Sequence, residues 1–339
     1  MKRIIGAALS ALAFAWGGLA SAADYPKMNL RMGHFLPATF AEADQDQWFA
    51  DEISRRSGGN INIEIFWAGS LGGPTELLSL VSAGAVEVVA FPVSYYPNEL
   101  PLHGVVSLPR NFKDAATARE TSDKLLQTDA LIGEQKKNNI RPVLVHNSNP
   151  YRLACNGPVG SLDEMKGYRA RSVGEYIPVM FNAVGLVPVN TPAGEVYEGL
   201  DRGTINCSML SYDQMEASKI YEVAKYASDI NLGALTTWKL WFNRDLFEGF
   251  PPEVQELILE VGKEATQRDL EAVERKIKGS VERLAEHGVS LTPLSDMGTF
   301  NTEIPLALDL WTAKMEKLGM NAEAAELRAI MEPVQAGFE

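Results

Sequence analysis

Cysteine and histidine are scarce in this sequence, which has two cysteines and four histidines in 339 residues. The histidines lie far apart, without the close spacing of zinc ligands, so we assign no metal site. Cys155 and Cys207 do not form a CxxC motif, and thiol redox chemistry therefore has no support. In an oxidising compartment the two cysteines can pair, and two buried free thiols are the alternative.

Motifs of the common catalytic devices are also absent. The chain contains no GxSxG, HExxH, GxGxxG, GxxxxGKS or GxxxxGKT motif, each of which builds a known catalytic or nucleotide-binding arrangement. We therefore assign no catalytic residue and no cofactor. His34 and His146 are expected to flank strand ends. Four acidic side chains are expected on solvated helix faces: Asp44, Asp46, Glu271 and Glu274.

Positive charge is in deficit. The sequence has 31 Lys and Arg against 44 Asp and Glu, a formal net charge of −13. A chain this acidic repels nucleic acids and anionic membrane surfaces, because both are negatively charged. We therefore expect neither nucleic-acid binding nor attachment to a membrane surface.

Long hydrophobic runs are limited to one, over residues 4–20. It follows Lys2 and Arg3 and leads to the small residues Ala20 and Ala22, a pattern that predicts a signal peptide over residues 1–23. An uncleaved membrane anchor is the alternative, and the length of the run argues against it, because about 17 apolar residues is the lower limit for crossing a bilayer. We expect export to the periplasm and removal of this leader.

The rest of the chain contains two similar series of strand and helix patterns. Alternating and apolar runs predict strands, and apolar residues at helical spacing predict helices. The first series has strands at 28–32, 61–66 and 86–90 and helices at 41–56 and 74–83; the second has strands at 168–171, 187–190 and 205–209 and helices at 173–183 and 194–202. Each series reads βαβαβ, which is typical of a parallel sheet covered by helices.

Two lobes are the expected result, since about 316 mature residues exceed what one hydrophobic core usually organises. Strand-like stretches at 142–146 and 236–243 fall where the chain would cross between lobes, and we expect hinges there. Apolar residues at helical spacing continue from 252 to 287, which predicts one helix about 50 Å long that spans both lobes. The predicted boundaries are 24–146 with 243–275 for lobe I, and 147–242 with 276–339 for lobe II.

A ligand site is expected in the cleft between the lobes, because ligands of open α/β sheets bind at the carboxyl ends of the strands. Arg171 ends a predicted strand there, and a guanidinium can bind a carboxylate through two parallel hydrogen bonds. A surface ion pair is its alternative role. Arg152 follows the first crossing and is either a second cation in the cleft or a clamp on the hinge. The other candidates near strand ends or crossings are Phe35, Trp67, Ser94, Tyr95, Met209, Leu210, Ser211 and Trp238.

Several segments in order resemble one protein family. They are Leu71-Gly72-Gly73 before a helix, the stretch 162–171 (LDEMKGYRAR), Gly194-Glu195-Val196-Tyr197, and the stretch 246–255 with its double proline. Over residues 28–270 the chain resembles the DctP-type solute-binding proteins of tripartite ATP-independent periplasmic (TRAP) transporters. The resemblance implies an α/β two-lobed periplasmic binding-protein fold that closes over an organic acid. It also implies that Arg171 binds the ligand carboxylate, that Arg152 is a second basic position, and that a membrane permease receives the cargo.

The chain departs from that family pattern at the pocket. The stretch 206–210 (NCSML) replaces the common Asp-Gly-Gln-Glu-Asn, and the aromatic residue often found before the Glu195 helix is replaced by Ala193 or Gly194. Trp238 on the second crossing moves aromatic surface to another wall. An aromatic or partly apolar monocarboxylate therefore fits somewhat better than a small dicarboxylate. A periplasmic hydrolase or lyase and a sensory binding subunit are the alternative functions, and the sequence leaves monomer and dimer open.

Overall fold

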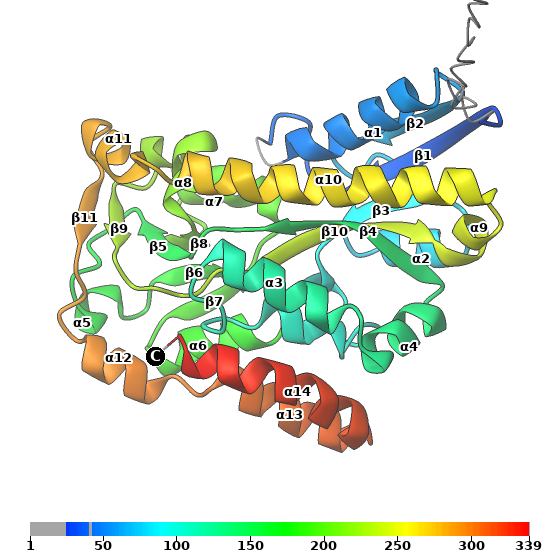
Figure 1. Cartoon of the computed structure of the whole chain (residues 1–339). Coiled ribbons are helices and arrows are strands. Elements are labelled where there is room, and N and C mark those ends of the chain that lie inside the picture. The colour runs from blue at the N-terminus through cyan, green and yellow to red at the C-terminus, as the bar shows by residue number, and fades with distance from the viewer. Residues whose placement is uncertain (1–24, 41–42, 339) are drawn as a thin grey trace, which may run out of the picture.

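The computed structural model describes residues 25–40 and 43–338. The predicted signal peptide lies outside the described residues. Two β-sheets, each flanked by helices, form two lobes that lie side by side (Figure 1). None of the helices in the described ranges is both long and apolar enough to cross a membrane.

The first sheet has the strand order β2-β1-β3-β10-β4. Its parallel part pairs β1 (Met28–His34) with β2 (Ile61–Phe66) and with β3 (Val88–Phe91). All four residues of β3 are buried, as expected for a central strand covered on both faces. Helices α1 (Asp44–Arg56) and α2 (Leu77–Ser82) connect these strands, which confirms the predicted βαβαβ order.

The two predicted crossing stretches are neighbouring strands of this first sheet. They are β4 (Ile140–Asn147) and β10 (Thr236–Asn243), which pair antiparallel. The chain passes toward the second lobe directly after β4 and returns directly before β10. The connection from β3 to β4 contains the 3₁₀ helices η2 (Val93–Tyr95) and η3 (His103–Ser107) and the helices α3 (Ala115–Leu125) and α4 (Asp129–Lys137).

The second sheet has the order β11-β9-β5-β8-β6-β7. Its strands are β5 (Arg152–Cys155), β6 (Arg169–Ser172), β7 (Val187–Asn190), β8 (Cys207–Leu210), β9 (Tyr226–Ser228) and β11 (Ser290–Thr292). Its helical segments are α5 (Leu162–Met165), α6 (Tyr176–Ala183), η4 (Ala193–Glu195), α7 (Val196–Asp201), α8 (Tyr212–Ala217) and η5 (Ile220–Glu222). Cys155 and Cys207 are opposite each other on β5 and β8 and form a disulfide, which decides between the two alternatives left open by the sequence.

The long C-terminal helix is shorter than the periodicity predicts. After α9 (Arg244–Glu248), α10 runs from Pro252 to Lys276 and α11 from Ser280 to Glu286. Gly279 separates them with a left-handed backbone (φ 73°), which an α-helix cannot continue through. At 1.5 Å per residue α10 is about 38 Å long. It runs from the first lobe to α8 of the second (Figure 1), so it still connects both lobes.

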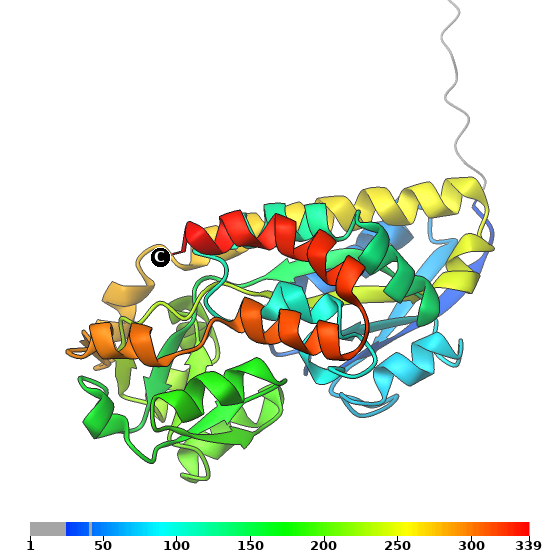
Figure 2. The same cartoon turned by 90° about the horizontal axis from the view of Figure 1, so that it is seen from below.

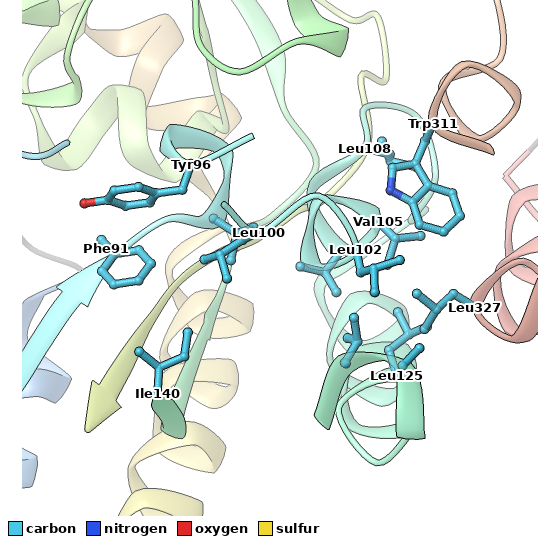
Figure 3. Close-up of a cluster of buried hydrophobic side chains, with 14 of the residues drawn as sticks. Phe91, Tyr96, Leu100, Leu102, Val105, Leu108, Leu125, Ile140, Trp311 and Leu327 are labelled. Carbon is cyan, nitrogen blue, oxygen red and sulfur yellow. The ribbon is translucent and has the colours of Figure 1, made fainter. Parts of the chain in front are cut away.

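The last two helices pack on the first lobe, although the predicted boundaries assign them to the second. After α12 (Met297–Glu303) the chain forms α13 (Ala307–Lys317) and α14 (Asn321–Ala336). Trp311 and Leu327 of these helices lie in one hydrophobic cluster with Leu102 and Leu125 (Figure 3). Seen from below, α13 and α14 pass beneath the first lobe (Figure 2). The β10 strand, also assigned to lobe II, belongs to the first sheet because it pairs with β3 and β4.

Candidate ligand-binding site

A cavity of about 430 Å³ lies between the two lobes. The first lobe lines it with residues that follow β1 and β3, such as Phe35 and Tyr95, and with the start of β10. The second lobe lines it with residues at the ends of β6 and β8, such as Arg171 and Met209. The carboxyl ends of parallel strands from both sheets therefore face this cavity, which is the arrangement that α/β proteins use to bind ligands.

Arg171 is held in a defined orientation in this cavity. It lies on β6, and its Nε donates a hydrogen bond of 3.0 Å to the carbonyl oxygen of Thr191. Neither Nη atom of Arg171 has a hydrogen-bond or ion-pair partner in the ranges 25–40 and 43–338. The backbone bond thus directs the guanidinium and leaves its two terminal donors for a ligand, the geometry that binds a carboxylate with two hydrogen bonds.

Most of the candidate residues predicted from the sequence meet at this cavity. Those that line it are Arg171, Phe35, Ser94, Tyr95, Met209, Leu210 and Trp238. Three candidates do not line it: Arg152, Trp67 and Ser211.

Arg152 begins β5 and makes its contacts outside the cavity lining. Its Nη1 donates to the carbonyl oxygen of Tyr151 at 3.0 Å and to Oδ1 of Asn231 at 3.2 Å. The guanidinium carbon lies 5.5 Å from the ring centre of Tyr212. These contacts correspond to the structural role that the sequence left as the alternative for Arg152.

Trp67 and Ser211 also have structural positions. The ring of Trp67 packs against His34, with 4.6 Å between the ring centres. Ser211 is fully buried at the start of α8, where its backbone N–H donates to the side chain of Gln214 at 3.2 Å. Both residues lie near strand ends, as predicted, but neither lines the cavity.

Aromatic rings at right angles form the wall of the first lobe. Phe35 meets Trp238 at 5.7 Å between ring centres and an angle of 70°, and it meets Tyr95 at 6.0 Å and 85°. Edge-to-face contacts of this kind are favourable because the edge of an aromatic ring is positive and its face is negative. The rings of Phe35, Tyr95 and Trp238 therefore form a corner in the cavity wall, in which neighbouring rings meet nearly at right angles.

A buried charged network holds Trp238 from behind. Trp238 Nε1 donates to Asp46 Oδ2 at 3.1 Å, and Asp46 also contacts His34 Nε2 at 2.9 Å and His146 Nε2 at 2.8 Å. The second ring nitrogen of His146 lies 2.8 Å from Asp269 Oδ1 on α10. The network thus connects a cavity residue to α1, β1, β4 and α10.

Contacts within this network keep His146 and Asp46 in their charged forms. Burial alone would lower the pKa of His146, but the carboxylates of Asp46 and Asp269 raise it to about 10. Burial would raise the pKa of Asp46, but His146 and His34 hold it well below its usual range. Asp46 and His146 are therefore a charged pair at neutral pH.

Asp46 contradicts the expectation of a solvated helix face, since it is 0% exposed. The sequence contained a signal for its burial, because Asp46 shares the i, i+3, i+4, i+7 stripe of α1 with Phe49, Ala50 and Ile53, all of which are buried. Asp44 on the same helix is exposed, as predicted. His34 and His146 do end strands, as predicted, but they also take part in this network.

Several lining residues were not predicted as candidates: Phe40, Tyr197, Gln214, Lys219 and Thr237. The Thr237 hydroxyl is buried and has no hydrogen-bond partner in the described part of the chain. It follows Thr236 at the start of β10, so the predicted crossing at 236–243 was the available signal. No group of three or more His, Cys, Asp or Glu side chains in the described ranges could hold a metal ion.

Curated relatives cover most of the chain. The 2,3-diketo-L-gulonate-binding periplasmic protein YiaO of Escherichia coli is 24% identical over 284 residues, which are 83% of this chain and 86% of that protein. The C4-dicarboxylate-binding periplasmic protein DctP of Rhodobacter capsulatus is 23% identical over 259 residues, which are 75% and 76% of the two chains.

Solved structures share the fold. DctP7 of Bordetella pertussis, an extracytoplasmic solute receptor that binds pyroglutamic acid, superposes with a TM-score of 0.78 at 22% identity, over 90% of this chain and 99% of that one. The model of the family DctP, "bacterial extracellular solute-binding protein, family 7", matches residues 32–301. This match covers well over half of the chain, and the protein therefore belongs to the DctP family of bacterial extracellular solute-binding proteins.

Proposed function

We propose that this protein is the periplasmic receptor of a TRAP-type uptake system and that Arg171 binds the carboxylate of its ligand. The observation that carries this proposal is the guanidinium of Arg171 in the cavity between the lobes, with both Nη atoms unpaired among the described residues. The relatives support it, because YiaO is named for 2,3-diketo-L-gulonate, DctP for C4-dicarboxylates and DctP7 for pyroglutamic acid. Each of these ligands carries a carboxylate.

The proposed binding step is a charge-assisted contact followed by closure. A carboxylate that enters the cavity receives two parallel N–H donors from Arg171, and both partners lose water as the lobes close around them. Closure is favoured because the ligand contacts both lobes only in the closed state. The free energy of binding thus stabilises one relative position of the lobes.

The proposed partner is a membrane permease that is driven by an ion gradient and has no ATPase. Membership in the family supports this partner, as do several solved structures of similar fold that are described as TRAP periplasmic solute-binding proteins. The closed receptor would present a surface that includes both lobes, which the open receptor would not.

A thermal-shift screen across organic acids tests the proposal. At least one carboxylate should raise the melting temperature of the wild-type protein, and Arg171→Ala should abolish that rise. Arg171→Lys should restore only part of it, because an ammonium lacks the planar fork of donors. Arg202→Ala is the matched control, since the Arg202 side chain is 73% exposed on the second lobe and outside the cavity. A full shift in Arg171→Ala would contradict the proposal.

A further inference from the structure

We infer that the cavity selects a monocarboxylate whose remaining part is a flat apolar ring. The inference rests on the proposed function, since it takes Arg171 as the carboxylate site, and it adds the chemical class of the ligand. It depends on the charges, the walls and the rigidity of the cavity.

The cavity lining has one partly buried cation. Among the described residues that line it, only Arg171 and Lys219 are charged, and Lys219 is exposed. A second carboxylate deep in the cavity would therefore lose its water without gaining a partner, which is a large cost for a full charge. One negative charge on the ligand matches the one inner guanidinium.

Apolar side chains of both lobes face the space beyond Arg171. The first lobe contributes the corner of Phe35, Tyr95 and Trp238, and the second contributes Val173, Ile177, Met209 and Leu210. A ring can place its face against one aromatic side chain of this corner and its edge against the next. At about 430 Å³ the cavity has the size of small-molecule sites, with room for a ring beyond the carboxylate.

Several polar groups of the lining already have partners within the protein. Tyr95 Oη accepts a hydrogen bond of 3.4 Å from Ala193 N, and the Thr236 hydroxyl contacts Ser122 and Asn147. The side-chain oxygen of Gln214 accepts from Ser211 N at 3.2 Å. These bonds leave fewer acceptors in the lining for a ligand with many hydroxyl groups, such as a sugar acid.

Trp238, one ring of the aromatic wall, is held in place before a ligand arrives. Trp238 is hydrogen-bonded to buried Asp46 and stacked on His146, with 4.2 Å between ring centres and an angle of 23°. A wall that cannot rearrange costs little entropy when a rigid ligand binds, and it fits a flat ring better than a flexible chain. Asp46 and His146 are thus positioning residues for the specificity of the cavity.

Titration calorimetry on the mature chain tests this inference with four acids of similar length. 3-Phenylpropionate should bind at least tenfold more tightly than glutarate, a diacid, than glucuronate, a sugar acid, and than 3-cyclohexylpropionate, which has the same carboxylate but a puckered ring. Tighter binding of any of these three overturns the inference. If glutarate binds more tightly than 3-phenylpropionate and Lys219→Gln removes this difference in affinity, Lys219 is a second carboxylate site.

Two variants locate the selectivity in the aromatic wall. Trp238→Leu should weaken 3-phenylpropionate binding at least tenfold and change 3-cyclohexylpropionate binding less than threefold, whereas Trp48→Leu, on a tryptophan outside the cavity, should change neither. Phe35→Leu gives the same test if Trp238→Leu does not fold. An equal loss for both acids contradicts the inference.

The two proposals fail in different ways. If Arg171→Ala still binds 3-phenylpropionate with wild-type affinity, the proposed carboxylate site is wrong. If Arg171→Ala abolishes binding of every acid but the wild type prefers glutarate or glucuronate, only the ligand class is wrong.

Discussion

Asp46 is the residue on which the buried network depends. It accepts hydrogen bonds from Trp238 and from two histidine rings in a site closed to water. Asp46→Asn removes the negative charge and leaves His146 with one carboxylate in place of two. Breaking a buried charged pair costs about 3–5 kcal/mol, so we expect the free energy of unfolding in urea at pH 7 to fall by about 3 kcal/mol.

The control for this change lies two residues earlier on the same helix. Asp44 is exposed in the first turn of α1, and Asp44→Asn should change stability by less than about 0.5 kcal/mol. Equal losses in the two variants would mean that the effect comes from the helix and not from the network.

Lys239 is a buried cation without a partner. It is 1% exposed, its Nζ has no hydrogen-bond partner in the described ranges, and Nζ lies 5.6 Å from the ring centre of Trp241. Burial lowers the pKa of Lys239 from 10.5 to about 7. The unfolded chain therefore holds this proton up to about pH 10, while the folded protein releases it near pH 7.

This difference in pKa makes part of the stability depend on pH. Between pH 7 and 10 the unfolded state binds the extra proton, so the contribution of Lys239 to stability rises with pH. Lys239→Met should stabilise the protein most at pH 6 and progressively less toward pH 10. His146 acts in the opposite sense, because its raised pKa gives stability that is lost as pH rises toward 10. Urea unfolding of wild type and Lys239→Met at each pH separates the contribution of Lys239 from that of His146. A difference in the free energy of unfolding that does not change with pH would contradict the lowered pKa of Lys239.

Single residues show where sequence reasoning succeeds and fails. The charge of Arg171 and its place at a strand end made it a candidate and left a surface ion pair as the alternative; the family resemblance favoured the ligand role. Arg152 has the same charge and also lies near a crossing, but it donates a hydrogen bond to Asn231. These two residues are 79 positions apart, so no local sequence pattern reveals this contact. The partner of Asp46, His146, is likewise 100 residues away.

Among the elements, α10 is the one that joins the lobes, and it packs closely on β4. At Gly262 an added Cβ would collide with the backbone carbonyl of Val143. Gly262→Ala should therefore lower the free energy of unfolding by about 1–3 kcal/mol, although alanine is the better helix former. Chemical denaturation measures the change.

The matched control is a glycine of another helix with open space around it. Nothing lies within 4 Å of a Cβ added at Gly133 in α4, so Gly133→Ala should stabilise the protein by about 0.5–1 kcal/mol. If Gly262→Ala and Gly133→Ala change the free energy of unfolding in the same direction, close packing of α10 on β4 does not explain the glycine at position 262.

Elements were predictable where their own pattern decides their structure. The strands β2 and β3 were predicted correctly because their sequence patterns match their burial: apolar residues alternate along β2, where every second residue faces the core, and run without a break along β3, which is buried on both faces. The end of α10 was missed because apolar spacing continues through Val281 and Leu284, whereas a single conformation at Gly279 ends the helix. Periodicity reports which face is buried, and it does not report a local break in the backbone.

At the scale of the whole molecule, an ion pair joins the lobes beside the cavity. Lys314 Nζ of α13, which packs on the first lobe, lies 2.6 Å from Glu175 Oε2, which precedes α6 of the second. Partly exposed pairs contribute about 0.2–1 kcal/mol, so Glu175→Gln should weaken ligand binding about two- to fivefold by destabilising the closed state. Calorimetry measures this, and high salt should reduce the difference.

Glu198→Gln is the control for the interlobe pair. Glu198 pairs with Arg202 within the second lobe, and both side chains are exposed. Glu198→Gln should leave the ligand affinity unchanged. If Glu175→Gln and Glu198→Gln weaken binding equally, the cause is the change in net charge and not the loss of an interlobe contact.

The lobes themselves were predicted, but their exact membership was not. The two βαβαβ series specify two sheets, while α13 and α14 return to the first lobe through contacts such as Trp311 Nε1 to the carbonyl of Pro101, 210 residues apart. Membership in a family of solute-binding proteins makes the chain a receptor, and not the hydrolase or lyase considered from sequence.

A ligand-bound crystal structure tests the central claim most directly. We predict that the acid that gives the largest thermal shift lies between the lobes, with its carboxylate oxygens within hydrogen-bond distance of both Nη atoms of Arg171 and with Nε still bonded to Thr191. A carboxylate bound elsewhere, with Arg171 making no contact to it, would contradict the account.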